Sequence, residues 1–62
     1  METYIIISDP DGDGKASIRR ASDKKVSRCK LTWLVNVSGG VYTAKSKTKA
    51  IRLDGLEWKT EG

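Results

Sequence analysis

Apolar and polar residues alternate with a period of two along much of the chain, a pattern typical of strands that bury one face. The clearest alternation runs over residues 29–38, where the odd positions are apolar and the even ones, apart from Leu34, are mostly polar. Residues 3–8 are rich in β-branched and aromatic side chains, and residues 15–20 alternate in the same way. Both segments are therefore predicted strands, and the Asp/Pro/Gly-rich stretch between them is a predicted turn.

Later in the chain, two short pairs of residues predict hairpin turns. The glycines at 39–40 favour a tight turn, because glycine adopts the positive φ angles that such turns need, and residues 41–44 would then return as a strand. The segment 45–53 allows two interpretations: a strand that enters a hairpin at Asp54-Gly55, or a short helix capped by Ser46. A helix of about eight residues is marginal by itself, so the strand is preferred.

Together these segments predict one small domain over residues 1–62. The expected fold is mostly β, an antiparallel meander of five or six strands forming a barrel-like or sandwich domain. The alternative is an α+β domain with one short helix near residues 46–54. The expected core consists of Ile5, Ile7, Ile18, Leu31, Trp33, Val35, Val37, Ile51, Leu53 and Leu56.

Several residue types are scarce, and their scarcity limits the classes of function that we expect. The only cysteine, Cys29, lies on the apolar stripe and is expected to be a buried, inert thiol. A lone cysteine and the lack of a recognisable secretory signal indicate a reducing, cytoplasmic setting. The longest apolar runs are far shorter than the roughly 18 residues of a membrane helix, so no membrane association is expected. The sequence has no histidine, no phosphate-binding loop and no zinc-ligand spacing. We therefore expect a binding protein with no cofactor rather than an enzyme.

The strongest functional indication is the placement of charge. The net charge is +4, but residues 15–52 hold eleven of the twelve Lys and Arg residues against a single acid, Asp23. Such a segment repels itself, and a polyanionic partner relieves that repulsion. The leading hypothesis is a nucleic-acid-binding module that contacts the phosphate backbone with little base specificity. Its candidate contacts are Arg19, Arg20, Lys24, Lys25, Arg28, Lys30, Tyr42, Lys45, Lys47, Lys49 and Arg52.

Within this basic segment, Lys45, Lys47 and Lys49 alternate with small residues. On a strand their side chains would share one face at a spacing of about 6.6 Å, which is similar to the spacing of phosphates along a nucleic-acid strand. On a helix they would spread over a wide arc. Lysines also protect edge strands against aggregation, which is the simpler explanation of the same pattern. A second hypothesis is therefore a protein-binding module or small regulator of a larger complex, docking through its basic face or a strand edge.

A third hypothesis comes from the acidic stretch at residues 9–14. Asp9, Asp11 and Asp13 stand at alternate positions and are followed by Gly14, an arrangement that resembles the first half of an EF-hand or dockerin calcium loop. The resemblance implies a weak Ca²⁺ site at these three aspartates. The sequence departs from that loop where its last carboxylate ligand should stand, because Arg20 occupies the position. Asp, Pro and Gly are also the ordinary residues of turns, and this interpretation is preferred to a metal site.

Overall fold

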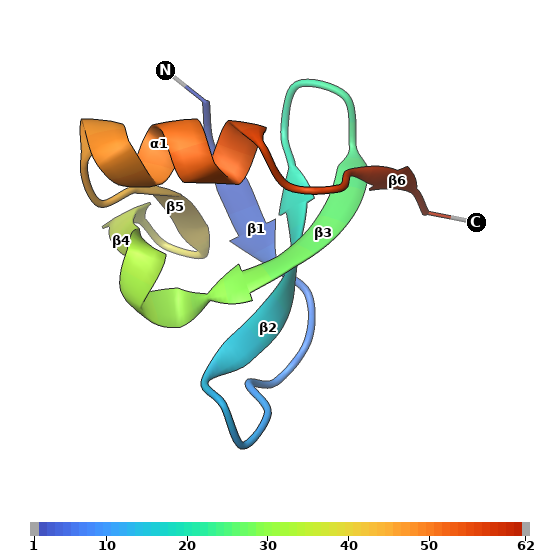
Figure 1. Cartoon of the computed structure of the whole chain (residues 1–62), viewed down its shortest axis with the longest axis horizontal. Coiled ribbons are helices and arrows are strands. Elements are labelled where there is room, and N and C mark those ends of the chain that lie inside the picture. The colour runs from blue at the N-terminus through green and yellow to red at the C-terminus, as the bar shows by residue number, and fades with distance from the viewer. Residues whose placement is uncertain (1, 62) are drawn as a thin grey trace.

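The chain folds into one antiparallel sheet with a single helix packed against it, as the computed structural model, which describes residues 2–61, shows (Figure 1). Over these residues the sheet has six strands, so the mostly-β prediction is confirmed. The strands are β1 (Tyr4–Ile6), β2 (Lys15–Arg20), β3 (Lys25–Lys30), β4 (Leu34–Ser38), β5 (Val41–Ala44) and β6 (Lys59–Thr60).

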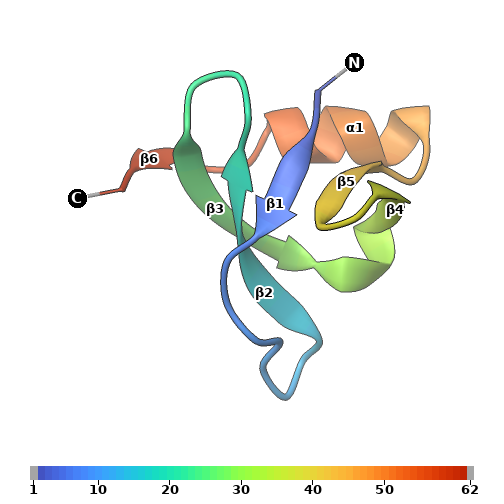
Figure 2. The ribbon, with the colours of Figure 1, turned by 180° about the vertical axis from the view of Figure 1, so that it is seen from behind.

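The strands do not follow one another across the sheet in chain order. Their spatial order is β4-β5-β1-β2-β3-β6. After β3 the chain passes through a 3₁₀ turn, η1 (Leu31–Trp33), and the β4–β5 hairpin then pairs with β1 on the side away from β2 (Figure 2). The sheet is consequently not closed, and β4 and β6 form its two edges in the described part of the chain.

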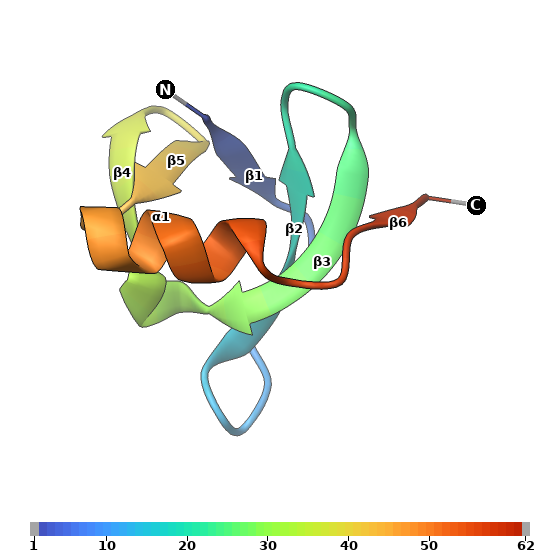
Figure 3. The same cartoon turned by 45° about the horizontal axis from the view of Figure 1, so that its top comes forward.

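The segment after β5 is helical, so the preferred strand interpretation of residues 45–53 is wrong and the helical alternative is confirmed. Helix α1 (Lys47–Asp54) lies across one face of the sheet (Figure 3). The Ser46 hydroxyl caps its start by accepting a hydrogen bond from the Lys49 backbone N–H at 3.2 Å. At its end the Trp58 indole N–H donates to the Leu53 carbonyl at 2.8 Å. Both caps and the burial of Leu53 stabilise a helix that is too short to be stable alone.

The core lies between α1 and the sheet, and it is smaller than predicted. Ile18 and Leu53 are fully buried as predicted, and Leu31, Trp33 and Leu56 pack partly buried against them. The prediction is wrong for five other residues, which are exposed: Ile5, Ile7, Val35, Val37 and Ile51. Buried in their place are Tyr4, Ala16, Cys29 and Leu34, so the expectation of a buried Cys29 is confirmed.

A shift of phase along the chain explains most of these errors. The 3₁₀ turn interrupts the alternating run after Lys30, so Leu34 faces the core and Val35 faces outward. In β1 both phases are apolar, and the phase containing Tyr4 is buried because its ring stacks on Trp58, with the ring centroids 5.8 Å apart. Alternation alone could not decide between the two phases.

The face of the sheet opposite α1 carries the displaced apolar residues. Ile5, Ile7, Val35 and Val37 are each between 38% and 49% exposed. Ile5 pairs with Val41 and Val35 pairs with Thr43, and these two partners are two residues apart in β5, so Ile5 and Val35 project from the same face of the sheet. We call this surface, defined by Ile5, Ile7, Val35 and Val37, the outer face. Within residues 2–61 no helix covers it.

Candidate polyanion-binding site

Three of the predicted phosphate contacts are already paired with carboxylates in the folded protein. Arg19 lies 3.3 Å from Glu61, Arg20 lies 2.6 Å from Asp23, and Arg28 lies 2.6 Å from Asp11. Over residues 2–61, the basic residues without an ion pair are Lys15, Lys24, Lys25, Lys30, Lys45, Lys47, Lys49 and Arg52. The charge available to a partner is therefore smaller and differently placed than the sequence suggests.

Arg20 belongs to a structural stack. Its guanidinium donates two hydrogen bonds to Asp23 and lies 4.4 Å from the centroid of the Trp58 ring, which stacks in turn on Tyr4. The hydrogen bond from Arg20 lowers the pKa of Asp23 to about 2, and burial raises the pKa of Tyr4. Asp23 thus stays ionised at neutral pH and holds Arg20 against the indole. This guanidinium is committed to the fold.

The acidic loop at residues 9–14 acts as a turn. Asp11 accepts hydrogen bonds from the backbone N–H groups of Asp13 and Lys15, and these bonds lower its pKa. Its second carboxylate oxygen binds Arg28, and Gly14 adopts a φ of 76° that glycine tolerates without strain. Within residues 2–61 no three of the potential ligands His, Cys, Asp and Glu come together, so Asp9, Asp11 and Asp13 do not form a cage.

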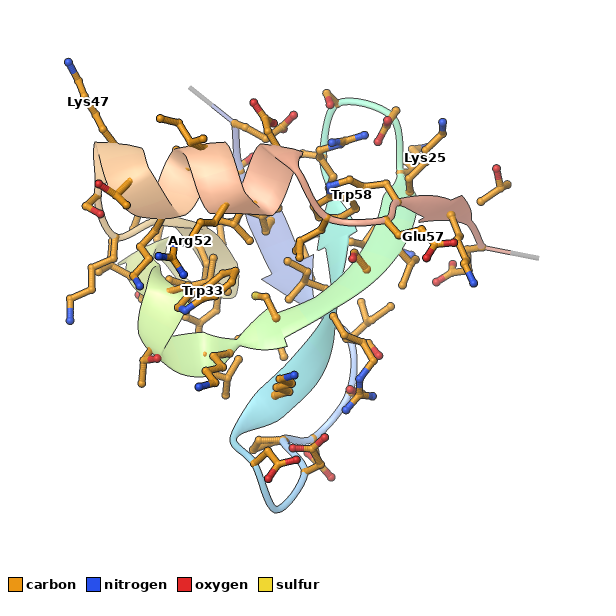
Figure 4. All side chains as sticks on the ribbon, in the orientation of Figure 1. Lys25, Trp33, Lys47, Arg52, Glu57 and Trp58 are labelled. Carbon is orange, nitrogen blue, oxygen red and sulfur yellow. The ribbon has the colours of Figure 1, made fainter. Side chains whose placement is uncertain are left out.

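The three alternating lysines do not form a row, because the segment is not a strand. Lys45 precedes the helix, and Lys47 extends away from its start (Figure 4). The Lys49 ammonium lies over the ring of Trp33 in η1. The arrangement expected on a strand is therefore wrong. Lys47 and Lys49, two positions apart on the helix, consequently project from different sides of it.

In place of that row, two basic side chains lie over the ring of Trp33. The Lys49 ammonium lies 5.2 Å from the centroid of the Trp33 ring, and the Arg52 guanidinium lies 6.0 Å from it (Figure 4). The Lys45 backbone N–H donates to the Trp33 carbonyl at 2.8 Å, which fixes the chain before α1 against η1. Lys49 and Arg52 are three residues apart, so they project from the same side of the helix. We call Trp33, Lys45, Lys49 and Arg52 the Trp33 cluster.

Two further lysines flank this cluster. Lys30 ends β3 immediately before η1, and its cross-strand partner in β2 is Lys15. Both are exposed, and like charges directly opposite each other destabilise a sheet. No ion pair offsets this repulsion over residues 2–61. Lys15 and Lys30 therefore bring two unpaired positive charges next to η1, where the acidic turn at residues 9–14 also lies, because the Leu31 backbone N–H donates to the Gly14 carbonyl.

The remaining candidates lie elsewhere. Lys24 ends the turn between β2 and β3, and Lys25 begins β3 at the opposite end from Lys30. The rise of a strand separates Lys25 from Lys30 by about 16 Å. Lys25 and Trp33 accordingly stand far apart in Figure 4. Tyr42 is partly buried against the core beside Tyr4. Lys24, Lys25 and Tyr42 are thus not part of the Trp33 cluster.

Sequence reasoning missed Trp33, which it assigned to the core. The ring does contact the core but remains partly exposed, because η1 turns the chain before β4 begins. The alternating pattern gives no sign of this turn. Only the spacing of Lys49 and Arg52, considered on a helix, could have suggested a shared target.

A groove of about 560 Å³ lies beside β3 and the C-terminal segment and does not adjoin the Trp33 cluster. Its lining includes Arg28, Glu57, Lys59 and Glu61. These charges already have partners: Arg28 pairs with Asp11, Lys59 with Glu57, and Glu61 with Arg19. The groove therefore presents little net charge to a ligand.

Comparisons of this chain with models of protein families, with curated protein sequences and with solved structures give no match. Among the helices within residues 2–61, none is long and apolar enough to cross a membrane.

Proposed function

We propose that the protein binds the phosphate backbone of nucleic acid through the Trp33 cluster, with Lys15 and Lys30 extending the contact. One observation supports this most directly: Lys49 and Arg52 converge on Trp33 although no carboxylate pairs with either of them over residues 2–61. In contrast, the three arginines of β2 and β3 are each paired with a carboxylate: Arg19, Arg20 and Arg28.

The free protein maintains this concentration of charge at an energetic cost. Lys49 lies in the first turn of α1, where the helix dipole is positive and a cation is disfavoured by about 0.3–1 kcal/mol. Lys15 and Lys30 repel each other across the sheet. A bound phosphate would relieve both repulsions, and binding at this end of the molecule is favoured for that reason.

Removing charge from the cluster should weaken binding more than removing the same charge elsewhere. We expect Lys49→Gln with Arg52→Gln to reduce the slope of log affinity against log salt on duplex DNA by up to about 1.8, because each phosphate contact contributes about 0.9. Fluorescence anisotropy between about 50 and 200 mM salt measures this slope. Glutamine retains most of each side-chain stem, so the helix should remain folded.

Lys24→Gln with Lys25→Gln is the matched control, because it removes the same formal charge from the opposite end of β3. This variant should leave the slope nearly unchanged. Equal losses in the two variants would mean that binding depends on net charge rather than on the Trp33 cluster. Salt-independent binding, or no binding to DNA and RNA, would disprove the proposed function.

A second candidate function is protein binding at the edge of the sheet, and the outer face favours it. Edge strand β4 has no charged residue and no proline, the usual protections against pairing with another strand, although a bulge occurs between Asn36 and Ser38. Val35, on the same strand, is 39% exposed. An extended segment of a partner protein could add to this edge and cover the valine.

Capture of a partner from nuclease-treated lysate would separate this candidate from the first. Val35→Lys should abolish such capture, because it places a charge in the contact. Ile51→Lys introduces the same charge at an exposed apolar residue of α1 and should have no effect. Capture that survives Val35→Lys would rule out the β4 edge as the docking site.

A further inference from the structure

We infer that the Trp33 cluster prefers single-stranded nucleic acid, with an unpaired base stacked on the Trp33 ring and its phosphates held by Lys49 and Arg52. This inference rests on the proposed function and specifies its ligand. The other tryptophan, Trp58, has no free ring face to offer a base. Its indole is enclosed by Arg20 and Tyr4, and its N–H is bonded to the end of α1.

Trp33 is placed differently. Like Trp58 it is partly exposed, but over residues 2–61 its ring has two cations within 6.0 Å and no aromatic neighbour. A cation above an exposed ring is held more weakly than a base stacked on it. A base can therefore replace the cations, and the released Lys49 and Arg52 side chains remain close enough to bind the phosphates of the same nucleotide.

Duplex DNA offers no comparable contact. Its bases are stacked on one another, and an indole can reach a base face only after neighbouring bases separate, which costs energy. A single strand presents its base faces at no such cost. Both forms satisfy the lysines and the arginine, so the stacking ring is what distinguishes them.

Two probes with the same number of phosphates isolate the stacking contact: an oligothymidylate of about ten nucleotides and an abasic strand of equal length. We expect the wild-type protein to bind the oligothymidylate about 5- to 140-fold more tightly, the factor that stacking of one base provides. Trp33→Leu should remove this difference, because leucine offers no aromatic face on which a base can stack. Trp33→Phe should retain part of the difference.

The outcomes separate the two proposals. Equal wild-type affinity for both probes, or a preference that Trp33→Leu preserves, would overturn the stacking inference and leave phosphate binding intact. A Trp33→Leu protein that loses affinity for both probes equally would assign Trp33 a structural role and would also overturn the inference. Failure of the wild-type protein to bind either probe would remove the proposed function and the inference together.

Discussion

Leu53→Ala is expected to lower the free energy of unfolding by about 2–5 kcal/mol, because it leaves a cavity in a core that cannot collapse to fill it. The Leu53 side chain is fully buried between α1 and the sheet, where it contacts the cluster formed by Tyr4, Ile18, Cys29 and Leu34. A domain of 62 residues has a total stability of about 3–9 kcal/mol. The substitution should therefore move the midpoint of urea denaturation to a much lower urea concentration.

Ile51→Ala is the matched control on the same helix. Ile51 is 73% exposed, so its truncation should change the free energy of unfolding by less than about 0.5 kcal/mol. The pair tests the helical phase of residues 47–54 directly. If Ile51→Ala destabilised the protein as much as Leu53→Ala, the side of α1 that carries Leu53 would not be the side that faces the core.

Trp58→Ala is the second substitution with a large expected effect, about 3 kcal/mol. That value is at the lower end for a core aromatic because Trp58 is only partly buried. The substitution to alanine removes the stack with Tyr4, the support for Arg20 and the hydrogen bond to the Leu53 carbonyl. Because Trp58 joins the end of α1 to β1 and β2, its loss should also decrease helix content in circular dichroism.

Trp58→Phe separates these contributions. A phenyl ring retains much of the stack but has no N–H to donate, so we expect a loss of about 1 kcal/mol, the usual value of one hydrogen bond. A loss as large as that of Trp58→Ala would mean that the hydrogen bond to Leu53, rather than the stack, holds the helix end. Thermal unfolding of both variants at one pH gives the comparison.

The candidate site was only partly predictable from the sequence. Lys45, Lys49 and Arg52 were among the predicted contacts because they lie in the basic segment. The same reasoning predicted three arginines, Arg19, Arg20 and Arg28. In the folded protein each of them is paired with a carboxylate, which only for Arg20 is close in sequence. Trp33 was not predicted, because its approach to Lys49 and Arg52 requires both the 3₁₀ turn and the helix.

What the sequence alone determined is local. The period of two predicted strand β2, the glycines predicted the turn after β4 and the return strand β5, and the single cysteine was correctly placed in the core. These features depend on residues close together in the chain, whose backbone preferences are expressed wherever the segment lies.

Tertiary structure decided which face of each element is buried and whether residues 47–54 are helical. Tyr4 rather than Ile5 faces inward because Trp58, far along the chain, supplies its stacking partner. The helix persists because Leu53 enters the core and Trp58 binds its last turn. These choices depend on contacts between distant segments, and for short elements such contacts outweigh the weak local preference that the sequence displays.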